Sequence, residues 1–126
     1  MKGSALLALI PFLPLAACAP EPPPARQSLA LDCDLPYETL AAKVLAQPGL
    51  KPAPQERGEP YRFYNMEGGG EAFVLTLPGA PGHPAVLKQE AVQENGGKVM
   101  KNTGCPYGDK AGFDELMTYL QSLSAR

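Results

Sequence analysis

Histidine, tryptophan and cysteine are scarce in this chain, which limits the chemistry that it can carry. The 126 residues include one histidine, three cysteines and no tryptophan. The single histidine, His83, cannot supply the several imidazole ligands of a typical zinc site, and no Cys-x-x-Cys pair accompanies it. The sequence therefore predicts neither a bound metal nor a cofactor.

Basic residues are also few. Lys and Arg number 11 against 13 Asp and Glu, which gives a formal net charge of −2 at pH 7. Nucleic-acid binding calls for a basic patch on the protein. Attraction to anionic lipid headgroups calls for a cluster of basic residues. We therefore expect neither a nucleic-acid partner nor an electrostatic contact with a membrane.

The N-terminal apolar run, Ala5 to Ala17, is too short to span a membrane as a helix. A spanning helix needs roughly 20 apolar residues, and Pro11 and Pro14 would break a helix in this run. Lys2 supplies a positive charge before it. A short apolar run after a basic residue is typical of a cleaved signal peptide.

The signal ends with four residues of a specific pattern, Leu15, Ala16, Ala17 and Cys18. They resemble the lipobox of bacterial lipoproteins, in which the cysteine is lipidated and becomes the first residue of the mature protein. The resemblance covers only the first 18 residues. It implies a membrane anchor of several acyl chains on Cys18, which holds a protein far more firmly than one chain does. An ordinary secretory signal with an incidental cysteine is the alternative.

The residue after the cysteine, Ala19, bears on the location of the anchor. It is not the aspartate that often retains lipoproteins in the inner membrane. The resemblance therefore implies a place in the cell envelope, on the outer membrane and facing the periplasm, in a bacterium with two membranes. In a bacterium with one membrane, the same signal implies the outer face of the cell.

A proline-rich segment follows the cysteine. Four of the ten residues from Ala19 to Ser28 are proline, which favours an extended polyproline conformation. We expect a tether rather than a peptide for a proline-binding domain, since such domains are mainly intracellular. The predicted organisation is a signal peptide over 1–17, a lipidated cysteine with its tether over 18–28, and one small domain over 29–126.

The two remaining cysteines, Cys33 and Cys105, are predicted to form a disulfide. Outside the cytoplasm, two thiols without partners of another kind are most simply explained by one bond between them. A reactive thiol or a metal ligand is the alternative. The bond would also staple a domain too small to bury a large core.

The pattern of apolar residues predicts two helices and about four strands. The first helix carries its apolar side chains at helical spacing, from Tyr37 to Leu45, and Asp34 is its expected cap. Asp109 is the expected cap of the second helix. The Asn95-Gly96 pair is a strong hairpin signal. The expected helices are Asp34–Gln47 and Asp109–Leu123, and the expected strands are Tyr61–Met66, Ala72–Leu77, Ala85–Gln93 and Lys98–Lys101.

These elements predict a two-layer α+β domain of order α-β-β-β-β-α. We expect an antiparallel sheet of about four strands with both helices on one face. Cys33 precedes the first helix and Cys105 precedes the second. The disulfide should therefore bring both helix N-termini to the same end of the domain, near Tyr107.

Few residues suggest catalysis. His83 lies between Gly82 and Pro84, which is typical of a turn, although a general base or metal ligand is the functional alternative. No serine stands in a Gly-x-Ser-x-Gly setting. Glu67 and Glu71 flank three glycines and could hold a cation, but a flexible turn explains this segment more simply. Catalysis by two carboxylates from distant positions stays open.

Two surfaces are candidates for binding. The segment from Gly104 to Asp109 could receive an anion at the helix N-termini, or be a turn that Asp109 caps. The uncovered face of the sheet is expected to carry Tyr and Arg, residue types that are enriched at binding hot spots. The residues proposed for a binding surface are Arg62, Tyr64, Lys88 and Tyr107.

The sequence thus favours a non-enzymatic envelope lipoprotein, with the membrane bound through Cys18. Its domain would bind another envelope protein or serve in structure or assembly. The alternatives are a small secreted hydrolase and a ligand-binding lipoprotein. The hydrolase would need a pocket that brings His83 together with a carboxylate, and ligand carriage would need an apolar cavity between helices and sheet.

Overall fold

The computed structural model of the chain describes residues 3, 11 and 27–124. The predicted lipidation site Cys18 lies outside the described residues, as do the predicted signal peptide, apart from Gly3 and Pro11, and the tether up to Arg26. No helix in the described part of the chain is both long and apolar enough to cross a membrane.

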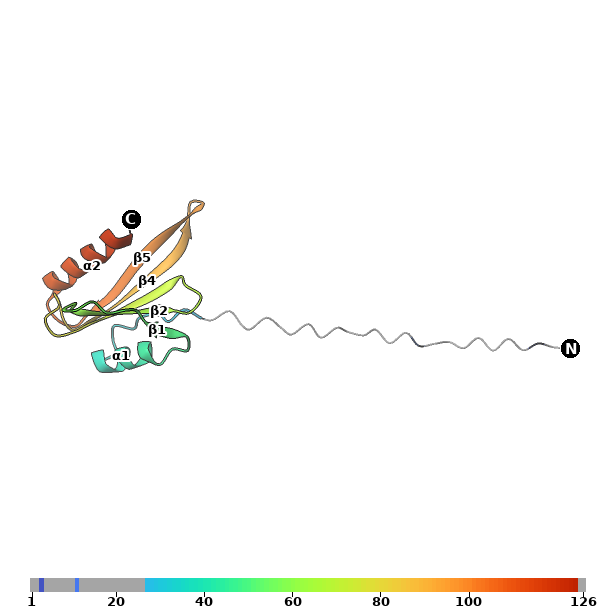
Figure 1. Cartoon of the computed structure of the whole chain (residues 1–126), viewed down its shortest axis with the longest axis horizontal. Helices are drawn as coiled ribbons and strands as arrows, with labels where there is room; N and C mark the ends of the chain where they lie inside the picture. Colours follow the sequence, from blue (N-terminus) through green and yellow to red (C-terminus); the bar gives the residue numbers. More distant parts are fainter. Residues whose placement is uncertain (1–2, 4–10, 12–26, 125–126) are drawn as a thin grey trace.

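The described domain is an α+β structure of two helices and a five-stranded antiparallel sheet (Figure 1). The strands follow one another across the sheet in the order β1-β2-β3-β4-β5, so every connection joins neighbours. The elements are α1 (Tyr37–Leu45), β1 (Leu50–Pro52), β2 (Tyr61–Met66), β3 (Glu71–Thr76), β4 (Ala85–Glu94), β5 (Gly97–Pro106) and α2 (Lys110–Ser124).

Glycine and asparagine at the turns explain the two tight hairpins of the sheet. The turn between β2 and β3 contains Gly68, Gly69 and Gly70, all with positive φ, a conformation that glycine adopts without strain. The turn between β4 and β5 is Asn95-Gly96, also with positive φ at both residues. This geometry matches the twist of the strands in a two-residue hairpin, and the hairpin predicted from Asn95-Gly96 is confirmed.

The two helices lie on opposite faces of the sheet, so the prediction of two helices on one face is wrong (Figure 1). The helix α1 buries Leu40 and Val44 against one face, and α2 buries Leu116 and Leu120 against the other. The reason is visible in the central strand. Five of its six residues, including the successive residues 73–76, are buried, and a strand that is apolar at consecutive positions is covered on both faces.

The sheet has one more strand than expected and a longer final strand. Leu50–Pro52 pairs with β2, with Leu50 opposite Met66. The sequence pattern did not predict this strand, because it contains a proline and is flanked by residues typical of loops. The last strand extends from Gly97 to Pro106 rather than from Lys98 to Lys101. It pairs along its whole length with β4 and forms an edge of the sheet.

The predicted disulfide between Cys33 and Cys105 is present. Cys105 is fully buried in the core on the α1 face. Both helices begin at the same end of the sheet, as predicted (Figure 1). Asp109 caps α2, since its carboxylate accepts a hydrogen bond from the N–H of Gly112 at 2.8 Å. Asp34 does not cap α1, because that helix begins only after Pro36 and has no side-chain cap.

Candidate functional site

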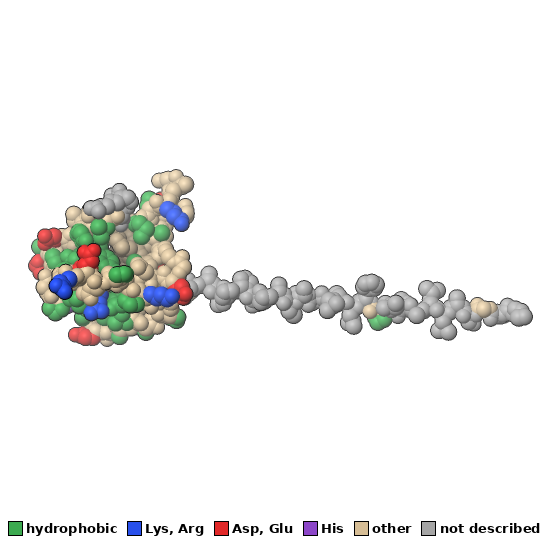
Figure 2. All heavy atoms as spheres, in the orientation of Figure 1, with side chains coloured by type: hydrophobic (Ala, Val, Ile, Leu, Met, Phe, Trp, Pro, Cys, Tyr) green, Lys and Arg blue, Asp and Glu red, His purple; other side chains and the backbone are tan. Residues whose placement is uncertain are grey.

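The hairpin of β4 and β5 projects beyond the end of α2 as an arm, which we define as residues 91–100 (Figure 1). Most of its side chains are exposed, and Val99 keeps 40% of its surface accessible. Figure 2 shows the arm standing clear of the body of the domain. Because neither helix packs over it, the arm forms a wall beside the open part of the sheet.

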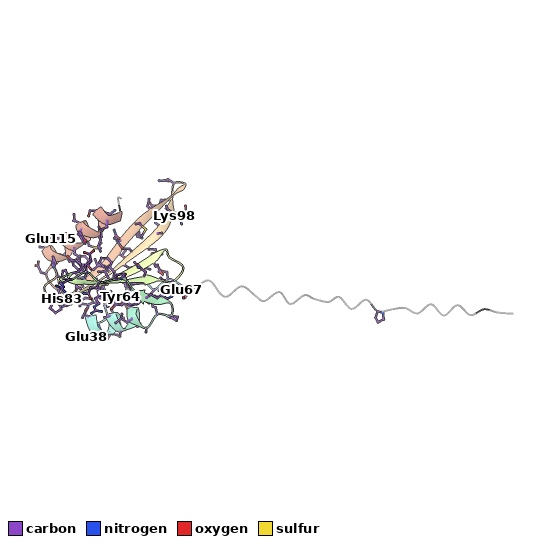
Figure 3. The ribbon with its side chains drawn as sticks, viewed as in Figure 1. Glu38, Tyr64, Glu67, His83, Lys98 and Glu115 are labelled. Atoms are coloured by element: carbon purple, nitrogen blue, oxygen red, sulfur yellow. A yellow bond between two sulfur atoms is a disulfide. The ribbon has the colours of Figure 1, made fainter. Side chains whose placement is uncertain are left out.

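A groove of about 360 Å³ lies at the base of this arm, between the arm and the loop that joins β2 and β3. Its volume is within the usual range for sites that bind small ligands or short segments. The groove is lined by Asn65, Gly69, Gly70, Glu71, Ala72, Gln89, Ala91, Lys98 and Met100. Figure 3 labels Lys98 on the arm and Glu67 at the start of the loop between β2 and β3, and these are the two segments that border the groove.

The strand register explains why these side chains meet. Asn65 lies opposite Ala72, which lies opposite Gln89, so one row crosses three strands. The small Ala72 forms the floor between two carboxamides. The row continues to Asn102 on β5, which donates a hydrogen bond to Gln121 of α2 at 3.0 Å. This last contact places the end of α2 beside the row.

Three polar side chains of the groove are not used by the fold. Asn65, Gln89 and Lys98 make no side-chain hydrogen bond or ion pair with any residue of the described domain. The Oδ1 atom of Asn102, next in the row, is buried and has no hydrogen-bond partner within residues 27–124. The donors and acceptors of Asn65, Gln89 and Lys98 therefore remain available for a ligand in the groove.

Glu71 is among the residues that line the groove, but its carboxylate lies on the opposite face of the sheet, because successive side chains of a strand alternate and the next residue, Ala72, faces the groove. It forms an ion pair with Lys88 at 3.4 Å, and both side chains are only 7% exposed. It also accepts a hydrogen bond from the hydroxyl of Ser28, and Lys88 donates to Ser28 and to the carbonyl of Leu29. A second carboxylate, that of Glu90, lies 3.5 Å from Lys88. This cluster fastens the start of the described domain to the sheet.

The four residues predicted as a binding surface do not form one open surface. Arg62 is exposed, but Lys88 is buried in the cluster just described. Tyr64 and Tyr107 pack against the core under α1. The hydroxyl of Tyr107 donates to the carbonyl of Leu35 at 2.7 Å, and burial raises its pKa above the usual 10.0.

His83 lies at the opposite end of the domain from Lys98 and Glu67 (Figure 3). Its Nδ1 is 2.7 Å from the hydroxyl of Thr76, and its ring makes an edge contact with Tyr37. The hydroxyl of Thr76 accepts a hydrogen bond from the backbone N–H of Ala85 and is 3.3 Å from the carbonyl oxygen of Ala85, to which it can donate. The tautomer of the His83 ring decides whether Thr76 or His83 is the donor in the bond between them. Within the described part of the chain, His83 forms no ion pair with a carboxylate.

The other candidate sites have ordinary structural partners. Glu67 pairs with Lys51 at 3.6 Å, whereas Glu71 pairs with Lys88, so the two carboxylates do not converge on a cation. Over the described residues, no group of three or more His, Cys, Asp or Glu side chains could hold a metal. At the start of α2 the carboxylate of Asp109 itself occupies the helix N-terminus.

Sequence reasoning missed the groove residues Asn65, Gln89 and Lys98. One signal was available, since the Asn95-Gly96 turn fixes which residues face each other along the arm. Comparison of the chain with models of protein families, with curated proteins and with solved structures finds no match.

Proposed function

We propose that this protein is a membrane-anchored lipoprotein of the bacterial cell envelope and that its domain is a non-enzymatic binding module. The resemblance of residues 15–18 to a lipobox supports the anchor. The groove supports the binding role. The observation that carries it is a set of groove side chains, Asn65, Gln89 and Lys98, that the described domain leaves without hydrogen bonds or ion pairs.

The contacts of Ser28 indicate where a tether would leave the domain. Ser28 is where the tether would join the domain, and it is bonded to Glu71 and Lys88. Glu71 also contributes to the groove. A tether from Cys18 would therefore leave the domain at the end that carries the groove, and would hold it within roughly 30 Å of the lipid. The groove would then lie within reach of partners close to the membrane.

Cross-linking in intact cells tests this function. A photoreactive amino acid in place of Asn65, which is exposed and lines the groove, should give a cross-link to one envelope protein reproducibly. The same amino acid in place of Glu38, which is exposed on α1 across the sheet, serves as the matched control. Irradiation should join the partner to the first variant only.

Two further results show whether the groove itself binds the partner. Lys98→Gln should weaken the cross-link from position 65 because it removes the groove's cation. Equal cross-linking from positions 65 and 38, or none from position 65, would contradict a binding role for the groove.

A further inference from the structure

The charge of the groove defines what it can attract. Two of its lining residues are charged, Lys98 and Glu71. The carboxylate of Glu71 is directed to the opposite face, where Lys88 and Ser28 bind it. Lys98 is thus the one charged side chain, among the described lining residues, that remains open to a ligand in the groove. A ligand with a negative group complements it.

The polar groups of the groove match a peptide chain. A carboxamide side chain has donors on its nitrogen and an acceptor on its oxygen, as a peptide group has one donor and one acceptor. Asn65 and Gln89 flank Ala72 in one row across the strands. A peptide lying over Ala72 would meet a carboxamide on either side. Both carboxamides could satisfy its N–H and C=O groups.

The apolar part of the groove limits the size of what fits there. Ala72 and Ala91 form a low floor, and Met100 stands beside them. Methionine is unbranched and adapts to irregular shapes. The groove therefore suits a short extended segment with small side chains better than a bulky ring system.

From the charge, the carboxamide row and the low floor together, we propose that the groove binds a short extended segment of another envelope protein that carries a free carboxylate. The carboxylate pairs with Lys98, and the peptide groups of the segment bond to Asn65 and Gln89. This inference rests on the proposed function and specifies the class of partner for the same site.

A pair of small probes tests the chemistry directly. The probes are N-acetyl-tetra-alanine with a free C-terminal carboxylate and the same peptide with a C-terminal amide. Each is titrated to millimolar concentration into the full-length, ¹⁵N-labelled protein in detergent micelles, and binding is followed by NMR. The carboxylate probe should shift the side-chain amide signals of Asn65 and Gln89 and the backbone signals of Gly69 and Ala91.

Two lysine variants provide the matched comparison. Lys98→Gln should weaken binding of the carboxylate probe about fivefold, because an exposed ion pair has a modest effect of that order. Lys101→Gln changes the same strand on the opposite face, since Lys101 lies opposite Glu90, and should leave binding unchanged. Added salt should weaken binding of the carboxylate probe more than binding of the amide probe, because salt screens the attraction between Lys98 and the carboxylate.

The outcomes distinguish this inference from the proposed function. Equal shifts from both probes, shifts outside the groove, or no shifts would overturn the peptide-carboxylate assignment. If cross-linking from position 65 still captured a partner, the binding module would stand and only the class of ligand would be wrong. If cross-linking failed while the carboxylate probe bound in the groove, the assignment of the groove to a peptide carboxylate would be supported. The proposal that the domain binds an envelope protein would then be wrong.

Discussion

Lys88 and Glu71 form a buried ion pair directly behind the groove. Their charged atoms are 3.4 Å apart and both side chains are 7% exposed. Glu71 is one of the residues that line the groove, and its carboxylate pairs with Lys88. The pair holds the N-terminal segment through Ser28. It also holds Glu71, which follows the loop that forms one wall of the groove.

The first prediction concerns the removal of this cation. Lys88→Met should lower the free energy of unfolding by about 3 kcal/mol, because it removes a buried positive charge that pairs with the carboxylate of Glu71. Chemical denaturation measures the change. Lys51→Met is the control, since the Lys51–Glu67 pair is 68% and 69% exposed and should contribute less than about 1 kcal/mol. An equal loss of unfolding free energy in the two variants would show that the buried pair stabilises the fold no more than the exposed pair does.

The disulfide should make a second large contribution. It joins cysteines 72 positions apart, and restriction of the unfolded chain suggests up to about 4 kcal/mol. Denaturation with and without dithiothreitol measures it. A Cys33→Ser/Cys105→Ala double variant should be less stable than the oxidised protein and insensitive to the reductant. An oxidised protein that reductant does not destabilise would contradict this role.

Stability should fall at alkaline pH. Burial raises the pKa of Tyr37, Tyr61 and Tyr107 above the usual 10.0. The folded state therefore holds these protons more tightly than the unfolded state does. Their stabilising contribution is complete below pH 10 and is lost as the pH rises through the folded-state values. Unfolding free energies measured between pH 8 and 11 should decline only above about pH 10, as linkage requires.

Tyr107→Phe separates one of these groups from the rest. The variant removes a titrating hydroxyl and its hydrogen bond to Leu35, so it should cost about 1 kcal/mol at neutral pH. Its stability should then decline less steeply in alkali than that of the parent protein. An equally steep decline would show that Tyr107 does not contribute to the pH dependence.

A glycine in α2 should resist a substitution that usually stabilises helices. Gly→Ala within a helix normally gains up to about 1 kcal/mol. At Gly112 the added Cβ would overlap the backbone of Gly82, so Gly112→Ala should instead destabilise by about 2 kcal/mol. Gly97→Ala is the control, because its Cβ would meet only a carbonyl oxygen at 3.9 Å. Thermal denaturation of both variants checks the contrast, and a stabilised Gly112→Ala protein would contradict the close packing.

Local patterns predicted the individual elements well. The helical spacing from Tyr37 to Leu45 and the Asn95-Gly96 turn correspond to α1 and to the last hairpin. Both features depend only on residues that are close in the sequence. The disulfide followed from the small number of cysteines, and it correctly placed both helix N-termini at one end of the sheet.

The arrangement of the layers and the site were not predictable in this way. Phe73 and Val74 are both buried, one under each helix, but a run of apolar residues does not state which helix covers which face. Lys88 resembled a surface residue because its partners, Ser28 and Glu71, are distant in the sequence. The groove depends on strand register and on the length of the arm, and these emerge only when the chain is folded.

The mass of the mature protein, purified from its own membranes, tests the central claim of an anchored lipoprotein most directly. We expect a chain that begins at Cys18 and carries the added mass of several acyl chains. It also predicts that alkylation labels Cys33 and Cys105 only after reduction. A chain that begins elsewhere and carries no acyl mass would contradict the anchor.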